Sequence, residues 1–419
     1  MKATSPPPAA ALPQAEPGGA SRLRRAPSPH AKGSGLKTAL RAAAPALLGY
    51  ASVRIIGIAV LAWWAQNRGA DLGELLGRRW DSVWYLGIVQ HGYDAAIPPP
   101  GAQGVSRSNL AFFPLYPAMV WVASHLLPLA ASTAGLLISW AFSLAAAWGI
   151  FEVGRQLHDR RTGVVLAVLW GVLPHALTES MAYTEPVFTA FAAWSLSMAL
   201  RRRWIAAALL SVLAGLTRPT GIALAGAISL AALVALWQHW RTRREVDAEP
   251  APAPWRPLVA VVLAPLGWLA YVVWVGLRLH RVDGYFLVQS EWGSTFDGGV
   301  YTVDNVIQFF SKSPNTALVI AVIVGTLISS VVLFLLCILD RVPLPLLAYT
   351  AAALVITLGG AGFFHAKARF LIPVFPLLLP VARAIARARV SRAAVLLGTG
   401  AVLSAVYGGH LALIWTRSP

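Results

Sequence analysis

The stretch ALVIAVIVGTLISSVVLFLLCIL, residues 317–339, decides the fold because it contains no charged side chain. A helix needs about 20 predominantly apolar residues to cross the hydrocarbon core of a bilayer, and this stretch supplies them. Eight further nearly uncharged runs flank it, and most approach that length: 42–66, 164–174, 186–200, 219–237, 258–279, 344–360, 370–382 and 393–415. The sequence therefore predicts an all-α, polytopic integral membrane protein.

The composition of the whole chain agrees with a membrane protein. Apolar side chains make up 57% of the 419 residues and charged ones 12%, whereas soluble domains average about 45–50% and about 25%. The formal net charge of +17 could indicate a nucleic-acid partner, but the basic residues form short clusters between apolar runs rather than one continuous face. Soluble enzymes and nucleic-acid-binding proteins are therefore excluded. The single cysteine, Cys337, excludes a disulfide framework and a cysteine metal site.

The basic clusters also predict the orientation of the chain. Residues 1–36 should form a disordered cytoplasmic tail, and 37–419 one transmembrane domain. The later arginine clusters also face the cytoplasm if the proline-broken run 110–129 lies at the outer surface instead of crossing. Residues 67–133 then form a first outer loop with juxtamembrane helices. We predict about eleven crossings, within a range of about 10–12: 41–66, 134–154, 163–176, 186–200, 204–217, 219–238, 257–279, 315–338, 343–361, 370–386 and 393–415.

This orientation places the polar segments that can carry chemistry on the outer side of the cell membrane. They are 67–109, 175–186, 217–221, 280–312 and 362–370. The chain has no glycine-rich nucleotide loop after a strand, no D-x-D pair and no H-E-x-x-H motif, so we predict neither a metal nor a cofactor. Arg54 lies inside the first crossing and should face the bundle interior with a partner that the sequence does not identify.

The segment RRWDSVWYLGIVQHGYD, residues 78–94, has the strongest pattern in these outer segments. As a helix it places Trp80 and His91 on one stripe and Asp81 and Tyr85 on the neighbouring one. Aromatic residues on such a stripe are typical of a helix at the membrane interface. Asp81 then either caps this helix or, partly desolvated, acts as a general base.

Other ionisable groups lie at the ends of predicted crossings. Glu185 precedes a proline and either complements a helix N-terminus or contacts substrate. Arg218 begins a helix, where the dipole disfavours a cation, so it should have an anionic partner. That partner is either a carboxylate such as Glu185 or a bound phosphate. His365, Lys367 and Arg369 precede an apolar run and either extend to lipid headgroups or bind a phosphate.

Several short motifs together resemble a known family. They are Trp80-Asp81 with Trp84-Tyr85 and His91-Gly92-Tyr93, then FFPLYP (112–117), YTEP (183–186), LTRPTG (216–221) and KARFLIPVFPLLLP (367–380). In this order they resemble the bacterial members of the PIG-V-type mannosyltransferase family, within the GT-C superfamily of membrane glycosyltransferases. The resemblance covers most of the chain after residue 40 and implies a GT-C-like outer loop of juxtamembrane helices after the first helix.

The resemblance also implies an activity. Such an enzyme transfers a sugar, typically mannose, with inversion from a polyprenyl-phosphate donor to a hydroxyl acceptor, a glycolipid or a protein, on the extracytoplasmic side. It implies that Asp81 is the catalytic residue and that no metal is needed. The chemistry of the residues agrees, because an acceptor hydroxyl needs a base and a leaving phosphate needs cations. Asp81 would be the base, and Arg218 with Lys367 or Arg369 would hold the phosphate.

Five other residues complete the predicted substrate site. Glu185 and His91 would orient sugar or acceptor, alongside Trp80, Tyr85 and His365. Two other functions remain open. A transporter or flippase for a lipid-linked or anionic substrate would have a similar helix count, but it should place charges near the bilayer midplane. A noncatalytic assembly subunit would not need an acid opposite basic clusters.

Overall fold

The computed structural model describes residues 35–99, 106–242, 254–311 and 318–418. The chain divides into two units, Met1–Arg41 and Ala42–Pro419, and the second is described below. Of the predicted tail 1–36, residues 1–34 lie outside the described residues. So do residues 100–105 of the predicted first outer loop. The tail and the loop boundaries therefore stay predictions.

Helices make up most of the described chain, as predicted, and the described residues also include two strands of two residues each. The elements are α1 (Leu36–Asn67), α2 (Leu72–Gly77), α3 (Asp81–His91), η1 (Asn109–Ala111), α4 (Leu115–Leu126), α5 (Ala131–Leu157), α6 (Arg160–Gly171), η2 (Ala176–Ser180), α7 (Glu185–Leu200), α8 (Trp204–Gly215), α9 (Gly221–Thr242), α10 (Trp255–Leu263), α11 (Leu266–Arg278), α12 (Gly284–Glu291), β1 (Thr295–Phe296), α13 (Val300–Ser311), α14 (Leu318–Leu339), α15 (Leu344–Gly359), β2 (Gly360–Ala361), η3 (Phe364–Ala366), α16 (Lys367–Phe370), η4 (Phe375–Leu378), α17 (Leu379–Arg387) and α18 (Val390–Leu413).

Six helical stretches among the described residues are long and apolar enough to cross a membrane. They are α1, α5, α9, α10 with α11, α14 and α18. A seventh crossing arises if the pair 364–370 and 375–387, bent by 72°, counts as one broken span. Every range predicted to cross contains helix, but α6, α7, α8 and α15 have only 12 to 16 residues. The number of about eleven crossings is therefore not confirmed, because these helices are short for a span.

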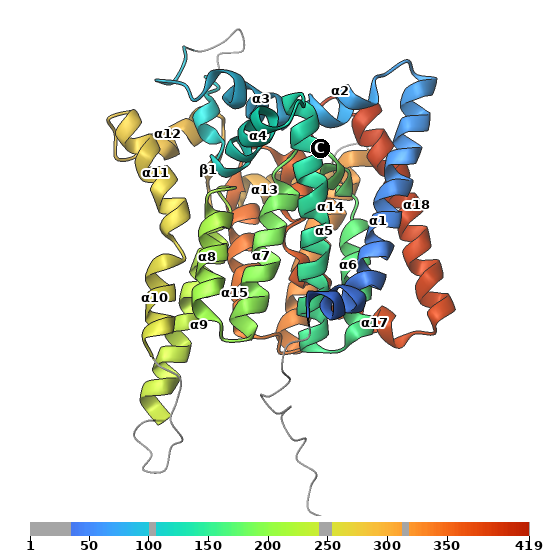
Figure 1. Ribbon diagram of the computed structural model, residues 1–419. Coiled ribbons are helices and arrows are strands. Elements are labelled where there is room, and N and C mark those ends of the chain that lie inside the picture. The colour runs from blue at the N-terminus through green and yellow to red at the C-terminus, as the bar shows by residue number, and fades with distance from the viewer. Residues whose placement is uncertain (1–34, 100–105, 243–253, 312–317, 419) are drawn as a thin grey trace, which may run out of the picture. The chain divides into compact units, whose positions relative to one another are not determined.

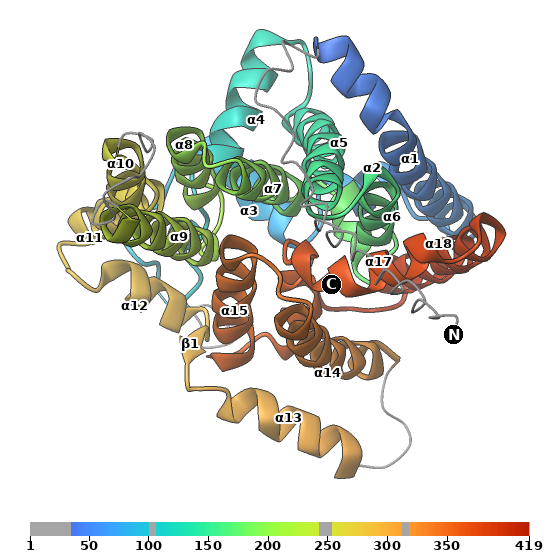
Figure 2. The same ribbon diagram turned by 90° about the horizontal axis from the view of Figure 1, so that it is seen from below.

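The short helices pack closely against their neighbours in the bundle. α7 packs between α5 and α8, and α15 packs on α9 (Figure 2). Small residues allow these backbones to approach closely, as is common between membrane helices. A Cβ on Gly154 of α5 would come 2.7 Å from the Cα of Gly163 in α6. A Cβ on Gly149 would come 2.9 Å from the Cβ of Ala193 in α7. Helix packing, rather than helix length, therefore positions this part of the bundle.

The region after the first helix forms short helices at one end of the bundle. α2, α3 and α4 lie together beside the end of α5 (Figure 1). α4 has 12 residues, fewer than a crossing needs. The N–H of Leu115, at its start, donates to the carbonyl of Leu216 at 2.9 Å. This bond ties the FFPLYP segment to the turn that carries Arg218.

Arg54 has a partner inside the bundle. Its Nη1 atom lies 3.8 Å from Glu179 Oε2 and donates to the Ala176 carbonyl at 2.7 Å. The hydroxyl of Tyr50 donates to the same Glu179 oxygen at 2.9 Å. Both charged side chains are buried, so the pair compensates two charges that would be costly alone. The Arg54 side chain therefore also supplies a hydrogen-bond donor to the irregular backbone just before α7.

A small strand pair positions the segment 362–370. β1 and β2 are antiparallel, with Thr295 opposite Ala361 and Phe296 opposite Gly360. The chain then reverses through Gly362 (φ +81°) and Phe363 (φ +47°) into η3 and α16. A Cβ at Gly362 would clash with the carbonyl oxygen of Gly293, so the turn requires glycine there.

Candidate active site

Asp81 is the first residue of α3 and follows a strained residue. Trp80 has φ +54°, which is rare for a residue with a bulky side chain. The N–H of Asp81 donates to the hydroxyl of Tyr183 at 3.3 Å, and Ser82 Oγ donates to the Ala182 carbonyl at 3.1 Å. These bonds hold the start of α3 against the segment that leads into α7.

The Asp81 carboxylate contacts Arg369 rather than its neighbours in sequence. Asp81 Oδ2 lies 2.8 Å from Arg369 Nη1. Arg79 instead donates to the Ala412 carbonyl at 2.7 Å, and Arg78 donates to Ser132 Oγ at 3.4 Å. The alternative in which Asp81 caps its helix beside Arg78 or Arg79 therefore does not describe this arrangement.

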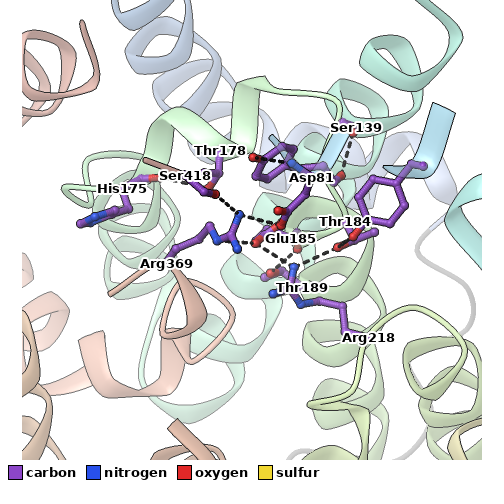
Figure 3. Close-up of polar contacts among 12 residues, drawn as sticks. Asp81, Ser139, His175, Thr178, Thr184, Glu185, Thr189, Arg218, Arg369 and Ser418 are labelled. Atoms are coloured by element: carbon purple, nitrogen blue, oxygen red, sulfur yellow. Dashed lines mark hydrogen bonds and ion pairs between the residues drawn. The ribbon is translucent and has the colours of Figure 1, made fainter. Parts of the chain in front are cut away.

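Two carboxylates and two guanidinium groups form a chain of contacts (Figure 3). Glu185 Oε1 lies 2.7 Å from Arg218 Nη1 and 3.5 Å from Arg369 Nε. Arg369 in turn pairs with Asp81. The residues come from α7, the turn before α9, α16 and α3, which are far apart in sequence. Four formal charges thus cancel in one cluster.

Hydroxyl groups complete the cluster. Thr184 Oγ1 accepts from Arg218 Nη1 at 2.9 Å and lies 3.1 Å from the hydroxyl of Tyr85. Ser418 Oγ accepts from Arg369 Nη1 at 3.2 Å. Both guanidinium groups are therefore oriented by at least two groups each, which is the preorganisation that an anion-binding site needs.

A cavity of about 800 Å³ opens over this cluster. Its size is within the range of small-molecule sites. Aromatic rings form much of its wall, including Trp84, Phe112 and Trp292, whose ring centroids lie 4.9 to 5.8 Å apart. Its acidic and basic lining residues are Asp81, Arg107, Arg218, His365, Arg369 and Arg417. Cations therefore exceed carboxylates around this space, so the cavity suits an anionic group.

Most of the predicted site residues gather here. Six of the nine line the cavity: Trp80, Asp81, Tyr85, Arg218, His365 and Arg369. Glu185 is not among the lining residues, and its side chain is only 1% exposed. It lies behind the two guanidinium groups and contacts both of them, as described above. The geometry therefore makes Glu185 a positioning residue instead of a direct contact to sugar or acceptor.

Lys367 faces away from the cavity. Its Nζ atom donates to the carbonyls of Thr357 and Gly360, both at 2.6 Å. These carbonyls belong to the end of α15, where helices leave carbonyls without partners. Residues two apart on a helical turn do not share a face, so Lys367 and Arg369 cannot both point into the cavity. We therefore correct the expectation that Lys367 holds a phosphate.

His91 is also far from the cluster. It lines a separate surface depression with Arg78 and Ser132. Ten residues of α-helix separate it from Asp81, which corresponds to about 15 Å along the axis. The two side chains therefore cannot serve one substrate group, and we remove His91 from the site.

The structure adds three residues that the sequence did not single out. Arg107 and Arg417 line the cavity, as does Trp292, which follows α12. Arg107 lies over the Trp292 ring at 5.7 Å. Arg417 follows the C-terminal end of α18, where the helix dipole favours a cation, so the argument made for Arg218 does not single it out.

No three residues of the types that usually bind metals gather anywhere in the described part of the chain. The two carboxylates in the cluster each contact a guanidinium group. Independence from metal remains a prediction of the sequence.

The fold is similar to that of a solved structure of ArnT. ArnT from Cupriavidus metallidurans, solved with bound undecaprenyl phosphate, superposes with a TM-score of 0.50 at 15% identity. The match covers 85% of this chain and 63% of that one, so the chain spans less than two thirds of the length of ArnT. An oligosaccharyltransferase from Archaeoglobus fulgidus gives a TM-score of 0.46 at 14% identity, covering 88% of this chain and 56% of that chain.

At 15% identity the likeness to ArnT concerns the fold alone, and the GT-C superfamily stays a prediction from the sequence motifs. The PIG-V-type subfamily and mannose stay predictions. No protein-family model and no curated protein sequence matches the chain.

Proposed function

We propose that the protein is an inverting membrane glycosyltransferase that moves a sugar from a polyprenyl-phosphate donor to an acceptor hydroxyl. The observation that carries this proposal is the meeting of Asp81, Arg218 and Arg369 at one cavity. The carboxylate is a candidate base and the two guanidinium groups are candidate phosphate ligands. A cavity at one end of an apolar bundle also suits a donor whose tail lies in lipid.

The reaction requires one bond to form as another breaks. The acceptor oxygen attacks the anomeric carbon opposite the phosphate, and the configuration inverts. The hydroxyl proton passes to the Asp81 carboxylate, and the phosphate oxygen leaves with the electron pair of the broken bond. Arg218 and Arg369 stabilise the charge on this leaving group with charge-assisted hydrogen bonds.

The remaining residues bind or position. Trp80, Tyr85 and His365 line the cavity and provide surfaces and hydrogen-bonding groups for the sugar or the acceptor. Glu185 holds the two guanidinium groups from behind. We further propose mannose as the sugar, a glycolipid or protein as the acceptor, and the extracytoplasmic side as the location, on the basis of the family resemblance and the positive-inside rule.

A transfer assay tests this function. Purified protein in nanodiscs is supplied with polyprenyl-phosphate mannose labelled in the sugar, together with membrane lipids and proteins as acceptors. We expect labelled product and free polyprenyl phosphate in equal amounts, and neither with Asp81→Asn. Movement of the intact donor between leaflets of proteoliposomes, without cleavage, would favour the flippase alternative. No cleavage with mannose or any other polyprenyl-phosphate sugar would contradict the proposal.

A further inference from the structure

We propose that the donor phosphate displaces Asp81 from Arg369, so that the base becomes free only when the donor is bound. This inference rests on the proposed function and concerns the same site. Asp81 Oδ2 contacts Arg369 Nη1 at 2.8 Å. While this contact persists, it holds the Asp81 carboxylate against Arg369 instead of leaving it free to turn toward an acceptor hydroxyl. The arrangement seen here is therefore a resting state.

Of the two terminal nitrogens of Arg369, Nη1 contacts other side chains among the described residues and Nη2 does not. Nη1 contacts both Asp81 and Ser418. Within the described residues Nη2 makes no hydrogen bond, and the residue lines the cavity. Arginine prefers to bind phosphate through two parallel N–H bonds. Because Nε faces the buried Glu185, a bidentate contact from the cavity uses Nη1 as well as Nη2, and so it competes directly with Asp81.

Asp81, not Arg369, is the partner free to move. The Arg369 side chain is 6% exposed, lies over the rings of Tyr183 and Phe370 at 5.3 Å, and has Glu185 beside Nε. The Asp81 side chain is 25% exposed and borders the cavity. A phosphate that takes Nη1 therefore leaves Arg369 in place and turns the Asp81 carboxylate into the cavity.

The charge balance favours the same exchange. In the resting cluster the two guanidinium groups are matched by Asp81 and Glu185. Glu185 is 1% exposed and stays with Arg218. An arriving phosphodiester brings a further negative charge, which replaces that of Asp81 at Arg369 and repels the released carboxylate. The acceptor hydroxyl would meet a free base only after this step.

The test measures binding of undecaprenyl phosphate to purified protein in phosphatidylcholine nanodiscs. The variants are Asp81→Asn, Arg369→Gln and the double variant, and Glu74→Gln serves as the matched control. Glu74 is an exposed acid in α2 that does not line the cavity. Because an amide competes less strongly than a carboxylate for Arg369, Asp81→Asn should bind about tenfold more tightly than wild type. Glu74→Gln should match wild type, and the gain should vanish in the Arg369→Gln background.

The outcomes separate the inference from the function. Equal or weaker binding by folded Asp81→Asn, or a gain that persists without Arg369, would overturn the exchange while leaving the proposed donor intact. An absence of saturable binding by wild type would overturn the proposed donor class and the exchange with it. A merely structural role for the Asp81–Arg369 pair predicts weaker binding when the pair is broken, so the direction of the change distinguishes the two.

Wild-type protein provides a second readout that does not depend on the variants folding. In protein labelled with ¹³C at aspartate carboxyl groups, infrared difference spectra are recorded with and without undecaprenyl phosphate. Release from a guanidinium group should shift the carboxylate band of one aspartate at saturating ligand. Unchanged carboxylate bands at saturation would contradict the exchange.

Discussion

Glu185 Oε1 lies 2.7 Å from Arg218 Nη1, with both side chains at least nine-tenths buried. Of the two partners expected for Arg218, a carboxylate or a phosphate, the structure shows the carboxylate. It does not exclude the phosphate, because Arg218 also lines the cavity. The pair therefore presents a guanidinium group that is already oriented before any ligand arrives.

Breaking this pair should destabilise the protein strongly. Glu185→Gln leaves a buried guanidinium group without its counter-charge, and such losses cost about 3–5 kcal/mol. Glu74→Gln, at an exposed acid, should cost less than about 1 kcal/mol. Denaturant unfolding in detergent micelles measures both free energies. Equal stability of the two variants would show that the Glu185–Arg218 contact is energetically unimportant.

Asp81→Asn should fold and lose most transfer activity. The amide keeps the shape of the side chain but does not take up the proton of the acceptor hydroxyl. General-base catalysis typically contributes about 10²–10⁴-fold, so the transfer rate should fall by that factor. The measurement is initial rate with saturating donor, beside the elution profile of the purified variant. A wild-type rate would require a different base.

Arg218→Lys should already weaken donor binding although the charge is kept. Lysine has no planar fork, so it cannot contact a phosphate oxygen and Glu185 in the same geometry. Arg218→Ala should weaken binding by about tenfold or more, since a charge-assisted contact is worth about 1.5–3 kcal/mol. Titration of the nanodisc-embedded variants with polyprenyl-phosphate sugar gives both constants. Unchanged donor affinity in both variants would show that Arg218 does not bind the donor and serves only as the ion-pair partner of Glu185.

Lys367→Met should lower stability and leave donor affinity unchanged. The substitution removes the donor to the carbonyls of Thr357 and Gly360, both at 2.6 Å. Buried carbonyls left without partners cost roughly 1–3 kcal/mol each. Unfolding and donor titration are measured on the same preparation. A selective loss of donor affinity would return Lys367 to the binding site.

The orientation in the membrane predicts which side reacts with an impermeant thiol reagent. In a Cys337→Ser background, cysteines at Val83 and Ser290 should react in intact cells, because both positions are exposed and each adjoins a cavity-lining residue in the sequence. A cysteine at Arg203, between α7 and α8, should react only after lysis. The reverse pattern would place the cavity on the cytoplasmic side.

The helices and the main site residues could be predicted from the sequence because their causes are local. An apolar run must avoid water, so its length and position predict a helix in a membrane. A charged residue at the end of such a run needs a partner, and this requirement singled out Arg218 and Arg369 before any contact was known. The aromatic pattern of 78–94 and the family resemblance singled out Asp81. The same requirement identified Arg54 but did not name Glu179.

The tertiary structure determines which group each of these charged side chains contacts. Lys367 and Arg369 look alike in sequence, yet the turn through Gly362 and Phe363 directs one to the end of α15 and the other to the cavity. The helices α12 and α13, and the cavity residues Arg107 and Arg417, also came only from the structure. The physical reason is distance. A sequence pattern states what a side chain requires, but the packing of helices far apart in the chain determines what lies within reach.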